Sequence, residues 1–182
     1  MRRLIGDGLA EIPWYEAEPE RLEREVLAMR RVAPDLTWDP VVGEGGGWAG
    51  ELPLWPFARP QPARLHEAVT KGLGVSIKLR QSHPAVEPGI VPRDPEPSIA
   101  YRTMHSWHLR GDGSLCLLQV ASDWSGREPV ADLATKAAGW HLEYLLMDTG
   151  IVQRMTLGGI ASSRKYDAFI ARYITRRLEG AA

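Results

Sequence analysis

The spacing of apolar residues predicts an amphipathic helix near the start of the chain. Leu22, Val26 and Met29 recur at helical intervals within Pro19–Arg31. The proline that opens this range suits a first helical position, and the two arginines that close it complement the helix dipole. Pro34 prevents the helix from continuing. We therefore expect one helix over Pro19–Arg31 and a different structure after it.

Period-two alternation predicts strands in the middle of the chain. Val75, Ile77 and Leu79 alternate with polar residues, as in a half-buried strand. Two further strands are expected at Leu36–Val42 and Trp48–Trp55, and regular structure is expected to resume at Ser98–Thr103. The five prolines from Pro84 to Pro97 favour an extended, non-helical crossover. Residues 56–74 are interpreted as an insertion with a short helix near Leu65 that Gly72 ends.

Two helices are expected in the last third of the chain. Ser125-Gly126-Arg127-Glu128 has the form of a capping box and predicts a helix starting near Pro129 and ending near Gly150. Its apolar positions are Val130, Leu133, Ala134, Ala137 and His141, and its second half is apolar nearly all round. A last helix is expected over about 163–178, with Ser162 or Ser163 as its cap. The order of elements predicts an α+β domain with a four-stranded antiparallel meander.

Composition narrows the class of protein. The 182 residues carry a formal net charge of −1 and include 44% apolar side chains, which predicts a single globular domain over 1–182. This balance argues against a nucleic-acid-binding protein, because contacts with phosphates need a surplus of Lys and Arg. The sequence lacks the roughly 18 consecutive apolar residues of a membrane span. Neither nucleic acid nor a membrane is an expected partner.

The cysteine count and the N-terminus bear on the compartment. A single cysteine cannot form an internal disulfide, so a reducing environment is expected. Acidic residues interrupt Met1–Glu11 before an apolar stretch of signal-peptide length develops. We therefore expect a cytoplasmic protein.

Cys116 is the first candidate for chemistry. It follows the turn Gly111-Asp112-Gly113 and precedes a second polar loop, a setting in which nucleophiles are often found. The alternative is that a lone cysteine between Leu115 and Leu117 is a small buried hydrophobe, which is the more frequent fate of single cysteines.

The residues around this cysteine resemble those of a ubiquitin-conjugating enzyme. The segment includes His105-Ser106-Trp107-His108, then Gly113-Ser114-Leu115-Cys116-Leu117, and Trp124 eight residues after the cysteine. The family has a helix, a four-stranded meander, a His-Pro-Asn tripeptide, a Gly-x-(Ile/Leu)-Cys-Leu segment, a tryptophan and further helices in that order. The resemblance covers about residues 16–147. In this chain His108 stands where the family has Asn, and the insertion at 56–74 lengthens the usual connection.

The resemblance implies a function and partners. The chain looks most like the bacterial branch encoded in ubiquitin-like conjugation operons associated with antiphage defence. Such a transferase accepts a ubiquitin-like modifier as a thioester on Cys116 from an adenylating activating enzyme and passes it to an amine. A JAB-type metallopeptidase is a further expected partner from the same operon. The protein itself needs no cofactor, since the activating enzyme uses the ATP. Arg21, Arg24, Arg30 and Arg31 lie on the helix with which the family contacts its activating enzyme, or form a solvated face.

The chemistry assigns a hypothetical role to His108. Attack of an amine on a thioester places negative charge on the carbonyl oxygen, which needs a preorganised hydrogen-bond donor. An imidazole N–H supplies such a donor, and a histidine that only supports a turn is the alternative. The catalytic candidates are therefore Cys116 and His108.

Other polar residues near the motif have open roles. His105 either supports the loop or takes part in the reaction, and Asp123 and Asp148 either orient an incoming amine or are solvated. Trp124 and His141 are interpreted as core residues. No spacing supports a metal site formed by the histidines and the cysteine.

Two other functions compete with transfer. A non-catalytic module of the same fold would bind a ubiquitin-like protein or scaffold a complex, with Cys116 packed inside. A hydrolase would pair Cys116 with His108, but the sequence offers no obvious Asp or Asn to orient the imidazole. The basic last helix either closes the core or docks a partner.

Overall fold

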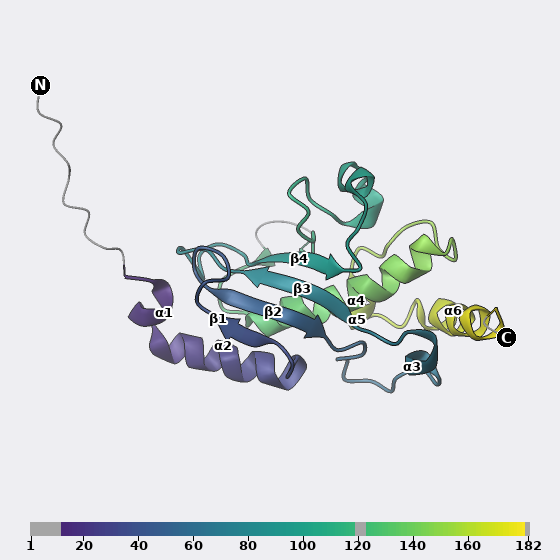
Figure 1. Cartoon of the computed structure of the whole chain (residues 1–182), viewed down its shortest axis with the longest axis horizontal. Coiled ribbons are helices and arrows are strands. Elements are labelled where there is room, and N and C mark those ends of the chain that lie inside the picture. The colour runs from purple at the N-terminus through teal and green to yellow at the C-terminus, as the bar shows by residue number, and fades with distance from the viewer. Residues whose placement is uncertain (1–11, 119–122, 181–182) are drawn as a thin grey trace, which may run out of the picture.

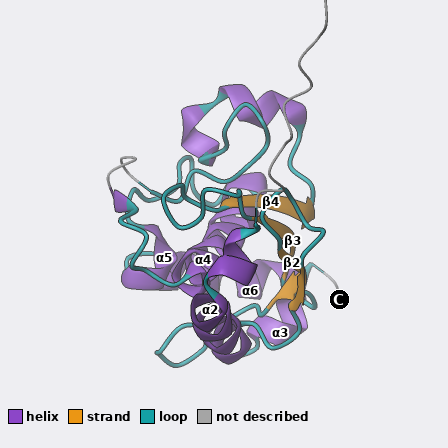
Figure 2. Ribbon diagram, turned by 90° about the vertical axis from the view of Figure 1, so that its left-hand side faces the viewer, coloured by secondary structure: helices purple, strands orange, loops and turns teal. Residues whose placement is uncertain are grey.

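Helices cover one face of a four-stranded sheet in the computed structural model, which describes residues 12–118 and 123–180 (Figure 1, Figure 2). The elements are α1 Trp14–Ala17, α2 Pro19–Val32, β1 Thr37–Asp39, β2 Gly47–Leu52, α3 Leu65–Ala68, β3 Leu73–Lys78, β4 Gly89–Asp94, the 3₁₀ helices η1 Ile99–Thr103 and η2 His105–Trp107, α4 Val130–Asp148, α5 Gly159–Ser162 and α6 Asp167–Glu179. The predicted α+β class is confirmed. Met1–Glu11, where the sequence predicts no export signal, lies outside the described residues.

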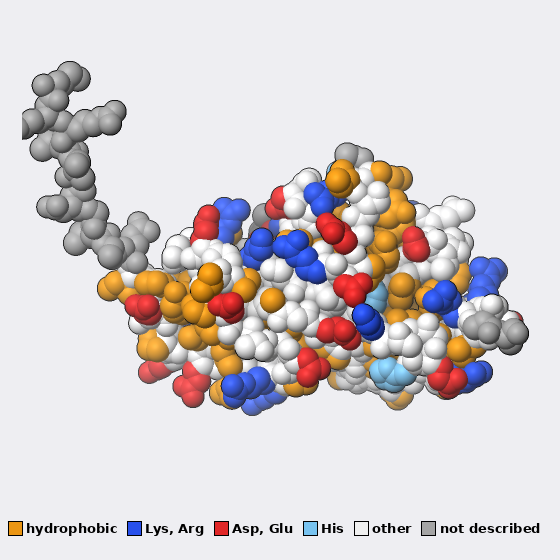
Figure 3. Space-filling view, in the orientation of Figure 1, with side chains coloured by type: hydrophobic (Ala, Val, Ile, Leu, Met, Phe, Trp, Pro, Cys, Tyr) orange, Lys and Arg blue, Asp and Glu red, His pale blue; other side chains and the backbone are white. Residues whose placement is uncertain are grey.

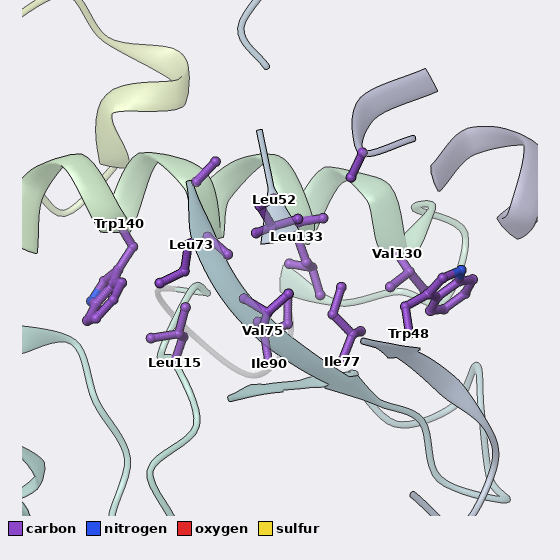
Figure 4. Packing of buried hydrophobic residues seen from close by; sticks show 14 of the residues in the cluster. Trp48, Leu52, Leu73, Val75, Ile77, Ile90, Leu115, Val130, Leu133 and Trp140 are labelled. Atoms are coloured by element: carbon purple, nitrogen blue, oxygen red, sulfur yellow. The ribbon is translucent and has the colours of Figure 1, made fainter. Parts of the chain in front are cut away.

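The sheet is an antiparallel meander in the order β1-β2-β3-β4, as predicted. Trp48 pairs with Ile77, and Ile77 pairs with Ile90 on the other side, so these three side chains lie on one face. All three are at most 1% exposed and pack under α4 (Figure 4). On the face of the molecule that Figure 3 shows, acidic and basic side chains are interspersed. One buried and one solvated face explain the alternation read from the sequence.

The fourth strand lies where we predicted a crossover, so that prediction is wrong. β4 runs through the proline-rich segment, and Pro92 pairs with Val75 next to a register shift in β3. The proline is tolerated because β4 is the last strand of the sheet, and an edge strand can lack a ladder donor. Ser98–Thr103 forms no strand; η1 occupies it, and the Ser98 hydroxyl accepts a hydrogen bond from the N–H of Ala100.

α4 is the central helix, and its start is held by a residue from α2. The Val130 N–H, at the first helical position, donates to Glu25 Oε2 at 2.8 Å, and Glu25 is only 5% exposed. The predicted capping box does form hydrogen bonds between Ser125 and Glu128, but it closes a separate turn before the helix. A long-range carboxylate therefore satisfies the donor that we expected a local serine to satisfy.

The insertion and the C-terminal helices form a second apolar cluster beside the main one. Arg59, within the insertion, pairs with Asp167 and donates to the carbonyl oxygens of Ile160 and Ser163. Its guanidinium carbon also lies 4.8 Å from the ring centroid of Trp55. The buried members of this cluster are Leu54, Phe57, Leu65, Ala68, Val69, Leu142, Leu146, Ile151, Val152, Ile160, Ile170, Tyr173 and Ile174. The apolar stripe of the last helix thus closes a core.

The boundaries of the last helix differ from the prediction of 163–178. α6 begins at Asp167, after the separate short helix α5, and no side chain caps it. The Ser163 hydroxyl instead accepts a hydrogen bond from the N–H of Lys165 within the connecting turn. The side chain of Ser162 lies outside what the structure describes. Among the helices of the described ranges, none has the length and apolar character to cross a membrane.

Candidate functional site

A short hairpin brings Cys116 and His108 together. Leu109 and Leu115 form an antiparallel bridge, and the Cys116 N–H donates to the carbonyl oxygen of His108 at 2.8 Å. His108 precedes Cys116 by eight residues in the sequence, and this spacing is the span of the hairpin. The structure therefore places the two predicted site residues opposite each other on neighbouring segments of the backbone.

The hairpin is fixed to the free edge of the sheet. The Leu115 N–H donates to the carbonyl oxygen of Ile90 in β4 at 2.8 Å, and the Leu115 side chain is 3% exposed. At the tip, Asp112 accepts hydrogen bonds from both the N–H and the hydroxyl of Ser114. Gly113 has φ +83° and packs against the guanidinium of Arg102, so a side chain there would strain the turn. The hairpin is therefore a rigid support for the cysteine.

Cys116 is half-buried and lines an open cleft. Its thiol lies 3.7 Å from the carbonyl oxygen of Leu118, to which it can donate. Leu115 is 3% exposed and packs inside, whereas Cys116 lines the cleft together with Leu117 and Leu118. A sulfur in this position is open to a partner without being on a flexible loop tip.

His108 occupies the left-handed region with φ 49°, at the end of η2. Its side chain is half-buried, and burial lowers the pKa of the imidazole from its usual value of 6.5. The ring is therefore neutral at pH 7, with one N–H donor and one acceptor nitrogen. His105 lines the same cleft but is exposed.

Stacked aromatic rings support the segment before the hairpin. Tyr101 and Trp107 stack with centroids 3.9 Å apart and planes 6° apart. Trp140 of α4 donates its indole N–H to the carbonyl oxygen of Trp107 at 2.9 Å. These contacts fix η2, and hence His108, relative to the central helix.

The cleft has a volume of about 790 Å³, two walls and a floor. The hairpin forms one wall, α4 forms the floor, and the segment 155–159 forms the opposite wall. The lining residues are Arg102, His105, His108, Leu109, Arg110, Gly111, Cys116, Leu117, Leu118, Lys136, Trp140, Glu143, Met155, Thr156, Leu157, Gly158 and Gly159. This space is large enough for a few residues of an extended peptide.

Glu143 holds the wall formed by segment 155–159, and it was not among the residues predicted from the sequence. This α4 residue is 2% exposed, and its carboxylate accepts hydrogen bonds from the N–H and the hydroxyl of Thr156 at 2.6 and 2.5 Å. Burial raises the pKa of this carboxyl group, while the bonds from Thr156 lower it. A glutamate in the otherwise apolar second half of a helix was the available signal.

Other candidates lie elsewhere. Trp124 is 9% exposed and donates its indole N–H to the carbonyl oxygen of Pro84, which confirms it as a core residue. His141 is 3% exposed and lines a different cavity with Asp94. Asp123 and Asp148 are exposed and do not line the cleft. Within residues 12–118 and 123–180, no group of three or more His, Cys, Asp or Glu side chains is arranged to hold a metal ion.

Comparison of the chain with protein-family models, with curated proteins and with solved structures finds no match. The functional argument consequently rests on the residues and geometry of this chain.

Proposed function

We propose that this protein is a conjugating enzyme of the ubiquitin-conjugating type. It accepts a ubiquitin-like modifier as a thioester on Cys116 from an adenylating enzyme and transfers it to an amine, in a bacterial antiphage conjugation system. The observation that carries the proposal is the hairpin that pairs a cleft-facing cysteine with a half-buried, neutral histidine. The adenylating enzyme, the modifier and the JAB-type peptidase follow from the sequence resemblance.

The order of elements supports the proposal. A helix, a four-stranded meander, a loop bearing the cysteine and a helix packed across the sheet follow one another, as in the ubiquitin-conjugating family. The tryptophan eight residues after the cysteine is buried and donates its indole N–H to the carbonyl oxygen of Pro84. Ser106 and Trp107 depart from the family tripeptide, and here the tryptophan has a structural contact, its carbonyl oxygen bonded to Trp140.

The two reaction steps match the two candidate residues. In the first, the Cys116 thiolate attacks the carbonyl carbon of the modifier's thioester on the activating enzyme, and that enzyme's thiolate leaves. This exchange conserves a thioester, so it needs an accessible sulfur and no strong base beside it. In the second, an amine attacks the new thioester, the carbon–sulfur bond breaks, and the sulfur leaves as thiolate while the amine loses a proton. The neutral imidazole of His108 has an N–H to donate to the carbonyl oxygen as negative charge grows there.

A thioester assay tests the proposal. Incubation with the cognate adenylating enzyme, the modifier and ATP is expected to give a band shift that dithiothreitol removes. Cys116→Ala is expected to abolish the shift, and Cys116→Ser to give an adduct that resists dithiothreitol. Genes for an adenylating enzyme, a small β-grasp protein and a JAB-type peptidase beside this one would identify the partners to use.

The same assay separates the non-catalytic alternative. If verified partners give no adduct and Cys116 reacts with iodoacetamide only after denaturation, the chain is a binding module. Rapid alkylation of the native protein, together with the adduct, supports transfer.

A further inference from the structure

We propose that the cleft selects acceptor amines that carry a neighbouring anionic group, such as a lysine flanked by acidic residues, and that Lys136 is the cation that recognises that group. This inference rests on the proposed transfer function and concerns its second step. It is carried by the distribution of charge around Cys116.

The charged side chains that line the cleft are mostly basic, and they differ in whether they already have an ion-pair partner. Arg102 lies 3.9 Å from Glu96, and Arg110 pairs with Glu87, so both rim arginines already have acidic neighbours. Glu143 is the one acidic side chain among the described lining residues; it is only 2% exposed, and its carboxylate is bonded to Thr156. The cleft therefore presents cationic groups and offers an incoming ammonium no accessible carboxylate among the described residues.

Lys136 stands apart from these groups. It forms no ion pair with any residue in the described part of the chain. It is half-buried in α4, one turn before Trp140 and two turns before Glu143, so all three side chains lie on the helix face that forms the floor. A half-buried ammonium without a partner favours an anion beside it.

Gln119, Val120, Ala121 and Ser122, the four residues of the chain that follow the lining residue Leu118, carry no charge in the sequence. They therefore add no carboxylate to offset the cations.

The charge pattern affects the acceptor in two ways. Like-charge repulsion disfavours a protonated amine near the thioester and favours its neutral form, which is the nucleophile. An anion on the acceptor next to the amine pairs with Lys136 and offsets the loss of water around both charges. The nitrogen then forms its bond to the thioester carbonyl carbon, the sulfur of Cys116 leaves, and the amine proton passes to water or buffer.

The experiment uses wild-type protein loaded with modifier, freed of activating enzyme and ATP, and followed in a single turnover. Three acetylated peptides each present one lysine, flanked by aspartates, by alanines or by arginines. We expect discharge to the aspartate-flanked peptide to be at least about fivefold faster than to the alanine-flanked one, and discharge to the arginine-flanked peptide to be slowest. The preference is expected to shrink as salt rises from about 0.05 to 0.5 M.

Matched variants assign the effect to Lys136. Lys136→Met is expected to bring the ratio of aspartate-flanked to alanine-flanked rates close to one, whereas Lys136→Arg keeps the charge and most of the preference. Lys165→Met, at an exposed position before α6, is the control for loss of a lysine and is expected to keep the full ratio. Circular dichroism of each variant checks its fold.

Specific outcomes overturn the inference. Equal rates for the three peptides do so, as does a preference that survives Lys136→Met. Mass spectrometry can also find the modifier on Lys136 itself. If Lys136→Met and Lys136→Arg both remove that product, Lys136 is an acceptor and not a recognition residue. Absence of any thioester on wild-type protein instead removes the proposed function, and with it the inference, so the two failures are distinguishable.

Discussion

His108 shows how one residue's backbone and side chain serve the same site. Its carbonyl oxygen accepts the Cys116 N–H, while its half-buried ring is neutral at pH 7 because burial lowers its pKa. Its φ of 49° is a conformation that asparagine adopts more readily than most residues. The proposed function puts His108 where the ubiquitin-conjugating family has asparagine, and the φ observed here is one that asparagine also adopts.

Substitution of His108 tests its role as a donor. We expect His108→Ala to leave thioester formation on Cys116 intact and to slow aminolysis about 10²–10³-fold, the usual cost of removing one oxyanion donor. His108→Asn restores an amide donor in a residue that tolerates the same φ, so it should recover most of the rate. Single-turnover charging and discharge measure the two steps separately. Equal loss of both steps in His108→Ala would assign the histidine to the structure of the hairpin.

The cleft wall formed by the hairpin was predicted from the sequence, whereas the wall formed by segment 155–159 was not. Cys116, His108 and His105 lie within twelve residues of one another, so their spacing in the sequence already carried the geometry. Lys136, Glu143 and Thr156 reach the cleft only through the packing of α4 and the segment after it. Contacts between residues so far apart in the sequence leave no local pattern. Of the three residues, only Glu143 was marked in the sequence, as a charged residue in an apolar stretch of helix.

Helices and strands were predicted best where a signal in the neighbouring residues was sufficient to set their bounds. α2 runs over Pro19–Val32 against an expected Pro19–Arg31, because a proline starts it and an apolar stripe defines it. β4 was missed because its prolines favoured a crossover, and the tolerance of an edge strand for Pro92 depends on the position of the strand in the sheet. The start of α4 was placed correctly near Pro129, but its cap, Glu25, is distant in sequence.

The link between α2 and α4 gives a stability prediction. Glu25→Leu leaves the Val130 N–H buried without a partner, so we expect a loss of about 1–3 kcal/mol in the free energy of unfolding. Glu25→Gln keeps an acceptor oxygen and should cost less. Glu23→Leu, an exposed position on the same helix, is the control and should change stability by less than about 0.5 kcal/mol. Urea denaturation followed by circular dichroism measures all three; equal effects at Glu25 and Glu23 would contradict the cap.

The molecule as a whole carries two buried histidines that respond to acid. Burial lowers the pKa of His83 and of His141 from 6.5 to about 4. A group with a depressed pKa in the folded state stabilises the fold above its unfolded pKa, and this contribution is lost as pH falls from 6.5 towards 4. Burial acts in the opposite direction on Glu25 and Glu143, whose raised pKa values favour the fold as pH falls.

His141 can be isolated from these opposing groups by substitution. Between pH 7 and pH 5, its titration is expected to remove about 2 kcal/mol of stability. In His141→Leu, the change in unfolding free energy over this range should therefore differ from that of wild type by about this amount. His66, an exposed histidine in α3, is the control, and His66→Gln should reproduce the wild-type pH profile. Parallel profiles for His141→Leu and wild type would show that His141 is protonated alike in both states.

Arg59 has a consequence for how the chain can be divided. The ubiquitin-conjugating resemblance ends near residue 147, yet the guanidinium joins the insertion to α5, to the residue that follows it and to the first residue of α6. A fragment cut at that boundary would leave Phe57 and Leu65 facing water, along with Leu146 at the end of α4. Such a truncated protein is expected to aggregate, so the shortest soluble unit for expression extends through the last helix.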